Sequence, residues 1–143
     1  MAKKEVDERF KKFGTVSFTG ISKVNDFIGY LEKGQVMATK CKNCSQVFFP
    51  PRADCYNCLS SEMDWIEVNG EGKLISFSKL MYGPTGFEND LPYTIAIVQF
   101  GDIKVFGRMS KEIPDEEIKI GMGVKVSPLQ LPEGRITYEF KKA

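Results

Sequence analysis

The chain has 143 residues, of which 42% are hydrophobic and 27% charged, the composition of an ordinary soluble globular protein of one or two small domains. Twenty basic and nineteen acidic residues leave a formal charge of +1, so charge gives no reason to expect nucleic acid or an anionic membrane as an obligatory partner. The chain contains no histidine, which excludes a Ser-His-Asp triad and a Cys-His nucleophile pair.

The amino-terminal residues are charged and no apolar segment follows them, so we expect no signal peptide. No apolar run approaches the roughly 20 residues that a membrane-spanning helix needs. We therefore expect a cytoplasmic protein. A reducing compartment also keeps cysteines available as metal thiolates.

Two short helices are predicted at the start of the chain, in a segment that we place at residues 1–36. Apolar residues at i, i+4 and i+7 in residues 5–13 predict an amphipathic helix that is too short to be stable by itself. Residues 22–34 predict a second helix, with Ser22 as its N-cap and Gly34 at its C-terminal end. The apolar stripe of this second helix consists of Val24, Phe27, Ile28 and Leu31.

These apolar helix faces have two interpretations. They can pack on the segment that follows, or they can present a surface to another protein, and both can hold together. A small following module offers little area to cover so many large apolar side chains, and exposed patches of this kind mark interfaces. The candidate interface residues are Val6, Phe10, Phe13, Phe27 and Leu31.

All four cysteines lie in two Cys-x-x-Cys motifs, and ten residues separate the two motifs. Four thiolates from two tight turns form the ligand set of a structural, tetrahedral zinc site. The four ligands are Cys41, Cys44, Cys55 and Cys58. They close the coordination shell, so one zinc per chain would hold a ribbon over residues 37–62 together and would not bind substrate.

Other uses of these four thiols remain open. Two disulfides are one alternative, although a two-residue loop strains a disulfide and nothing indicates secretion. Redox-active thiols are another. Iron in a rubredoxin-like site is a third, because four thiolates also suit iron.

From residue 63 onward the pattern is that of short strands. Strands are predicted over residues 73–82, 93–100, 103–109, 124–131 and 135–141. Gly101-Asp102 is typical of a tight hairpin turn, and residues 83–92 form an exposed loop. Five strands with a hairpin followed by a crossover predict a small barrel of the OB type over residues 63–143. The whole chain is thus predicted to be mainly β, with short amino-terminal helices, a rubredoxin-like zinc ribbon and a five-stranded OB-fold barrel.

Several short motifs carry a resemblance to a known family. They are the Phe49-Pro50-Pro51-Arg52 run before the second cysteine motif, Gly70 and Gly72, Pro92-Tyr93 and Gly121-x-Gly123-Val124. In this order, and together with the cysteine motifs, they resemble the zinc-ribbon/OB-fold acyl-CoA-associated family, long carried as a domain of unknown function. One position departs from the family pattern: Ser45 stands where glycine is usual. Because this position often takes a positive φ, Ser45 should cost some local strain.

The resemblance implies a non-catalytic accessory subunit that binds a thiolase-superfamily enzyme, such as acetoacetyl-CoA thiolase or hydroxymethylglutaryl-CoA synthase, or another acyl-CoA enzyme. It also implies that the subunit helps to hold acyl-CoA. Cations near Phe48 and Phe49 would suit the phosphates of CoA. The candidates are Arg52, Lys40 and Lys42. The alternative role of Arg52 is to cap the ribbon turn only.

Two other functions fit the same modules. Zinc ribbons and OB barrels recur in nucleic-acid-binding proteins, although the neutral charge and the lack of a basic aromatic stripe argue against that function here. A rubredoxin-like electron carrier is the other, and the colour of the metal would identify it.

Overall fold

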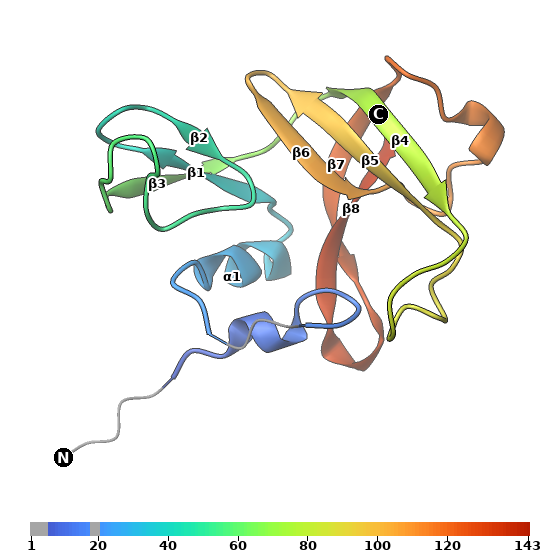
Figure 1. The fold of residues 1–143 in the computed structure, drawn as a ribbon, viewed down its shortest axis with the longest axis horizontal. Coiled ribbons are helices and arrows are strands. Elements are labelled where there is room, and N and C mark those ends of the chain that lie inside the picture. Colours follow the sequence, from blue (N-terminus) through green and yellow to red (C-terminus); the bar gives the residue numbers. More distant parts are fainter. Residues whose placement is uncertain (1–5, 18–20) are drawn as a thin grey trace.

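The computed structural model describes residues 6–17 and 21–143 and arranges them as a small ribbon sheet beside a five-stranded barrel (Figure 1). The helices are η1 (Arg9–Lys12), α1 (Asp26–Glu32), η2 (Asp115–Glu117) and η3 (Pro132–Gly134). The strands are β1 (Met37–Cys41), β2 (Val47–Phe48), β3 (Met63–Glu67), β4 (Gly72–Leu80), β5 (Tyr93–Phe100), β6 (Ile103–Arg108), β7 (Gly123–Gln130) and β8 (Ile136–Lys142).

The ribbon sheet has the order β2-β1-β3, and both pairings are antiparallel. The central strand β1 is buried at four of its five residues and ends at Cys41, the first cysteine. Thr39 in the middle of β1 lies opposite Phe48 on one side and Trp65 on the other. The sheet therefore places the start of the first cysteine motif at the end of its best-covered strand.

The barrel sheet has the order β6-β5-β4-β7-β8 with antiparallel neighbours. Its two outer strands meet through a parallel bridge between Met109 and Phe140, and the Ser110 N–H donates to the Phe140 carbonyl at 2.8 Å. This contact nearly closes the sheet into a barrel. The residues with no exposed surface at its centre are Leu74, Val98, Val105, Val124 and Phe140. The predicted mainly β fold with a ribbon and an OB-type barrel is confirmed.

The amino-terminal segment packs between the ribbon and the β7–β8 hairpin (Figure 1). Phe27, Ile28 and Leu31 of α1 are buried together with Ile136 of β8. The predicted end of the helix is confirmed, because Gly34 has a φ of 88° and its N–H donates to the Leu31 carbonyl. The Gln35 N–H donates to the Tyr30 carbonyl, which completes a Schellman motif.

Two details of the predicted helices are wrong. Of residues 5–13, only Arg9–Lys12 form a helix in the part that the structure describes, and it is a single 3-10 turn. A segment this short gains too few backbone bonds to propagate a helix. Ser22 is not the N-cap of α1. Its hydroxyl accepts the Val24 N–H in a turn that precedes the helix, and Asn25 occupies the N-cap position.

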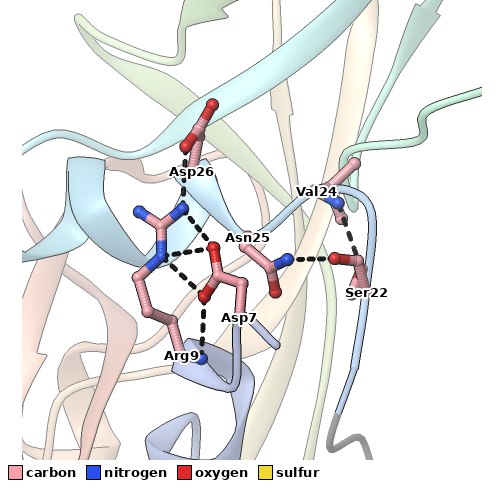
Figure 2. A network of polar contacts seen from close by, with 6 residues as sticks. All are labelled: Asp7, Arg9, Ser22, Val24, Asn25 and Asp26. Carbon is pink, nitrogen blue, oxygen red and sulfur yellow. Dashed lines mark hydrogen bonds and ion pairs between the residues drawn. The ribbon is translucent and has the colours of Figure 1, made fainter. Parts of the chain in front are cut away.

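Polar contacts fasten the 3-10 turn to α1. Figure 2 shows the Arg9 guanidinium between the carboxylates of Asp7, at 2.7 Å, and Asp26, at 2.9 Å. The hydrogen bond from the Arg9 side chain lowers the pKa of Asp7. These groups are partly exposed, and ion pairs of that kind stabilise a fold only slightly. The apolar packing of the segment therefore matters more than this network.

Candidate metal centre and adjoining groove

The two cysteine motifs form turns of the same geometry. In the first, the Ser45 N–H donates to the Cys41 carbonyl at 2.9 Å, and the Cys41 N–H donates to the Gln46 carbonyl at 2.8 Å. The second turn, Cys55–Ser60, has the same two bonds at equivalent positions. The Leu59 N–H donates to the Cys55 carbonyl at 2.9 Å, and the Cys55 N–H donates to the Ser60 carbonyl at 2.8 Å. We call each of these turns a knuckle. The local hydrogen bonds of each knuckle hold its two thiols on the same side of the turn.

The residue after the second cysteine of each knuckle adopts a left-handed conformation. Ser45 has a φ of 65° and Leu59 a φ of 64°. The positive φ expected at Ser45 is confirmed, and the exposed residue Leu59 bears the same strain. Because the knuckle bonds need this backbone conformation, the chain accepts the strain at both positions.

The four sulfur atoms converge on one point. Cys41 Sγ lies 3.5 Å from Cys58 Sγ, Cys44 Sγ lies 3.5 Å from Cys55 Sγ, and all four lie within 4.8 Å of one another. A tetrahedral ion with Zn–S bonds of about 2.3 Å separates its sulfur ligands by roughly 3.8 Å, whereas a disulfide bond is about 2.05 Å long. The four thiols therefore fit a single tetrahedral zinc ion and leave no ligand position for a substrate.

Each knuckle also supports a thiol of the other one. A hydrogen bond from the Asn43 side chain is the largest cause that lowers the pKa of Cys58, to about 6. The pKa of Cys44 is lowered first by the backbone at Gln46 and then by the Asn57 side chain. These asparagines are not among the site residues predicted from the sequence. The sequence does contain a pattern that could have indicated them, because both motifs read Cys-x-Asn-Cys.

Burial has the opposite effect on another ligand. It raises the pKa of Cys55 to about 11, so this thiol ionises readily only when a cation is beside it. Cys41 and Cys55 are buried, and Cys44 and Cys58 are half-buried. The metal would thus sit at the edge of the ribbon, with one side in a small apolar cluster that includes Phe48 and Met63.

A groove of about 690 Å³ lies between the ribbon and the β5–β6 turn. It is lined by Gln46, Val47, Phe48, Phe49, Pro50, Pro51, Arg52, Tyr56, Asp102, Ile103 and Lys104. The Arg52 guanidinium carbon lies 5.7 Å from the centre of the Phe48 ring and 5.5 Å from that of Tyr56. It forms no ion pair with any residue in the described ranges 6–17 and 21–143.

The other two predicted cations do not line this groove. Lys42 pairs with Asp64 at 3.6 Å, and Lys40 is exposed elsewhere on the ribbon. Lys104 of β6 lines the groove together with Arg52. No sequence signal connects Lys104 to the ribbon, because the packing of the barrel against the ribbon brings them together.

The predicted partner surface is only partly exposed. Phe27 and Leu31 are 2% and 1% exposed, so these two residues cannot form an outer surface of the chain, and that part of the prediction is wrong. The two amino-terminal phenylalanines are half-buried in the same cluster, and Val6 is 52% exposed. The prediction weighed these side chains against the ribbon alone. In the structure the β7–β8 hairpin supplies the missing area through Ile136 and Tyr138.

Comparison with known families agrees with this architecture. Residues 30–64 match the family model described as the ChsH2 rubredoxin-like zinc ribbon domain, and residues 65–127 match the ChsH2 C-terminal OB-fold domain. The chain belongs to the ChsH2 family of zinc-ribbon and OB-fold proteins. The resemblance found in the sequence is thereby confirmed. Among the described residues, the ChsH2-family chain has no helix that is long and apolar enough to cross a membrane.

Relatives of this ChsH2-family chain include two kinds of protein. A "DUF35 domain-containing scaffold protein" of Methanocaldococcus jannaschii is 33% identical over 77% of this chain and 82% of its own length. The "Benzoylsuccinyl-CoA thiolase subunit BbsA" of Geobacter metallireducens is 32% identical over 72% of this chain and 71% of its own length. The solved structure "Ltp2-ChsH2(DUF35) aldolase" has a TM-score of 0.70 at 23% identity and covers 87% of this chain and 98% of that one. This last likeness shows the fold.

Proposed function

We propose that this chain is a non-catalytic accessory subunit of an acyl-CoA enzyme of the thiolase superfamily. The similarity to a thiolase subunit and to scaffold proteins of the same fold supports the proposal. The chemistry of the chain agrees with it. There is no histidine to act as a base, and the four cysteines are accounted for by the metal site.

We further propose that the groove beside the ribbon holds the CoA portion of the substrate. CoA carries a phosphorylated adenosine, a pyrophosphate and a thin pantetheine arm, so its site needs cations beside an apolar channel. The groove offers Arg52 and Lys104 as cations and the ring of Tyr56, an exposed residue, as an apolar face. The observation that carries the proposal is that the Arg52 guanidinium lies in this groove without an ion-pair partner among the described residues.

Arg52 is the first residue to test, because its planar fork can form two hydrogen bonds to one phosphate. The Arg52→Ala variant should weaken acyl-CoA binding by the enzyme complex, measured by calorimetry, by about 10-fold or more, since hydrogen bonds to charged groups contribute about 1.5–3 kcal/mol. Zinc content and assembly should not change. The matched control is Lys42→Ala, which removes a ribbon cation outside the groove and should leave the affinity unchanged.

Two results would contradict the CoA site. If Arg52→Ala binds acyl-CoA as tightly as the wild type, the contacts to CoA lie elsewhere. If the variant loses zinc together with affinity, Arg52 caps the ribbon turn. The accessory role is tested separately: a tagged chain expressed in its native host should copurify with a larger acyl-CoA enzyme, and isolation without any such enzyme would argue against it.

A further inference from the structure

Among the residues that the structure describes, the second half of β4 has a neighbouring strand on one side only. Strand β4 pairs with β7 at Gly72 and Lys73, and Leu74 adds two more backbone bonds on that side. On the other side the pairing with β5 continues as far as Leu80. Figure 1 shows the end of β4 diverging from β7. The segment 75–80 is therefore an open sheet edge, independent of the metal site and of the groove.

The orientation of the β5 backbone determines which groups lie at this edge. The Thr94 carbonyl accepts the Met109 N–H at 2.9 Å, on the side of β6. In an antiparallel ladder, alternate residues direct both backbone groups to the same neighbour. Ala96 thus also faces β6. Ile95 and Ile97 alternate with Thr94 and Ala96, so they direct their N–H and C=O groups to β4.

The partners of these residues on β4 follow from the register. Ser78 lies opposite Ile95 and Ser76 opposite Ile97, so these two serines form the bonds to β5. Phe77 and Lys79 alternate with them and direct their N–H and C=O groups away from β5. Within the described part of the chain, no backbone bond outside the β5 ladder reaches either residue. Four backbone groups are therefore unpaired.

The side chains around these groups are unusually exposed for a strand. Five consecutive residues, 75–79, are exposed, and Ile75 and Phe77 are 41% and 40% exposed. Met81 and Tyr82 continue the apolar stretch at 61% and 89%. Natural proteins usually protect such an edge with charge, proline or a covering segment. Here the one charged side chain of the segment, Lys79, is paired with Asp115.

We propose that this edge pairs with the same edge of a second copy of the chain, so that two barrels share one antiparallel sheet across a twofold axis. In a register centred on Ser78, Phe77 of each copy lies opposite Lys79 of the other. The two residues then exchange both of their bonds, and all four free groups on each chain are satisfied. A twofold contact requires such a self-complementary edge.

The side chains favour the same register. It places Ile75 opposite Met81 of the second copy, so exposed apolar side chains cover one another. It also keeps the two lysines apart. A register centred on Lys79 would place them directly opposite, where like charges destabilise a strand pair. In the register centred on Ser78, the edges of the two copies are thus complementary in backbone hydrogen bonds, in apolar contacts and in charge.

A proline at position 79 tests the backbone pairing. Lys79→Pro removes an N–H that faces the open edge and that the β5 ladder does not use, the position at which strands tolerate proline. The matched control, Lys79→Ala, keeps the N–H and loses the same charge. Sedimentation should give twice the chain mass of 16.1 kDa for the wild type and for Lys79→Ala, and one chain mass for Lys79→Pro with unchanged zinc content.

A charge exchange tests the register and does not depend on whether the proline variant folds. Phe77→Lys should separate the dimer, because it places lysines opposite one another across the axis. Adding Lys79→Glu to it should restore the dimer through opposite charges. A wild-type monomer, or a dimer that neither Lys79→Pro nor Phe77→Lys disrupts, would overturn the proposal. So would amide-exchange protection of residues 77 and 79 that appears only when an acyl-CoA enzyme is bound, since the edge would then belong to the enzyme.

Discussion

Asn43 and Cys58 belong to different knuckles, and the Asn43 side chain lowers the pKa of the Cys58 thiol. The pKa of Cys44 is lowered first by the backbone at Gln46 and then by the Asn57 side chain of the other knuckle. Each knuckle thus favours the ionised form of a metal ligand of the other, and the two halves of the site depend on one another. Groups that support metal ligands in this way typically contribute about 10- to 100-fold in metal affinity.

Removing one of these amides should weaken zinc binding in a pH-dependent way. The pKa of Cys58, about 6 against the ordinary 9.0, leaves this thiol ionised at neutral pH. In Asn43→Ala the pKa should rise toward the ordinary value, so protons compete with zinc at pH 7. Zinc should therefore be released at a higher pH than in the wild type when the solution is acidified, as a competing chromophoric chelator would report.

The two proteins should behave alike well above pH 9, where the thiol is ionised in both. Asn69→Ala, an exposed asparagine outside the knuckles, is the control. Equal release curves for Asn43→Ala and the wild type would show that the amide does not support the ligand.

The metal itself should be zinc, about one per chain, because four thiolates close one tetrahedral shell. The protein should be colourless. Cys58→Ser should lose the metal and unfold the ribbon, since metal-binding energy in small sites of this kind is folding energy. Elemental analysis measures the metal content, and thermal melting measures the stability. The control is Ser61→Ala, which leaves all four cysteines in place. Iron in the purified protein, or an unchanged melting temperature for Cys58→Ser, would refute the prediction.

The barrel core should be sensitive to truncation at its closing strand. Phe140 is fully buried where β6 meets β8, so Phe140→Ala should lower the free energy of unfolding by about 3–5 kcal/mol. Ile120→Ala, at a side chain 62% exposed, should change it by no more than about 0.5 kcal/mol. Denaturant titration compares the two, and similar effects would mean that the barrel does not close at Phe140.

Arg135 should hold the amino-terminal segment in place. Its Nε donates to the Gly14 carbonyl at 2.6 Å, and its two terminal nitrogens donate to the carbonyls of Lys11 and Phe13 at 3.2 and 3.1 Å. In Arg135→Ala these carbonyls lose their donors, so the backbone amides of residues 9–14 should exchange faster with solvent. Hydrogen exchange by mass spectrometry measures this. Arg52→Ala should not alter exchange there, and equal rates in Arg135→Ala and wild type would contradict the assignment.

Binding to single-stranded nucleic acid should be weak. A chain of net charge +1 can neutralise few phosphates, and the salt dependence of such binding follows their number. A fluorescence titration at about 0.15 M salt should show no saturable binding. Submicromolar affinity under these conditions would favour a nucleic-acid module over an acyl-CoA subunit.

The sequence determined the features whose physical cause is local. The alternation of residues 93–100 placed β5 with the bounds that the structure shows, and the glycine at 34 ended α1, because backbone preferences and turn chemistry act over a few residues. The two Cys-x-x-Cys motifs gave the metal ligands for the same reason. The strain at Ser45 followed from its place in the knuckle.

Only the tertiary structure decided which surfaces meet. Phe27 and Leu31 have the apolar spacing of any exposed docking helix, and they are buried because a hairpin a hundred residues later packs on them. Lys104 has no sequence relation to Arg52, and it shares the groove because the barrel lies against the ribbon. Burial depends on the sum of contacts from every element. A periodic pattern shows which face of a segment is apolar and does not show what covers it.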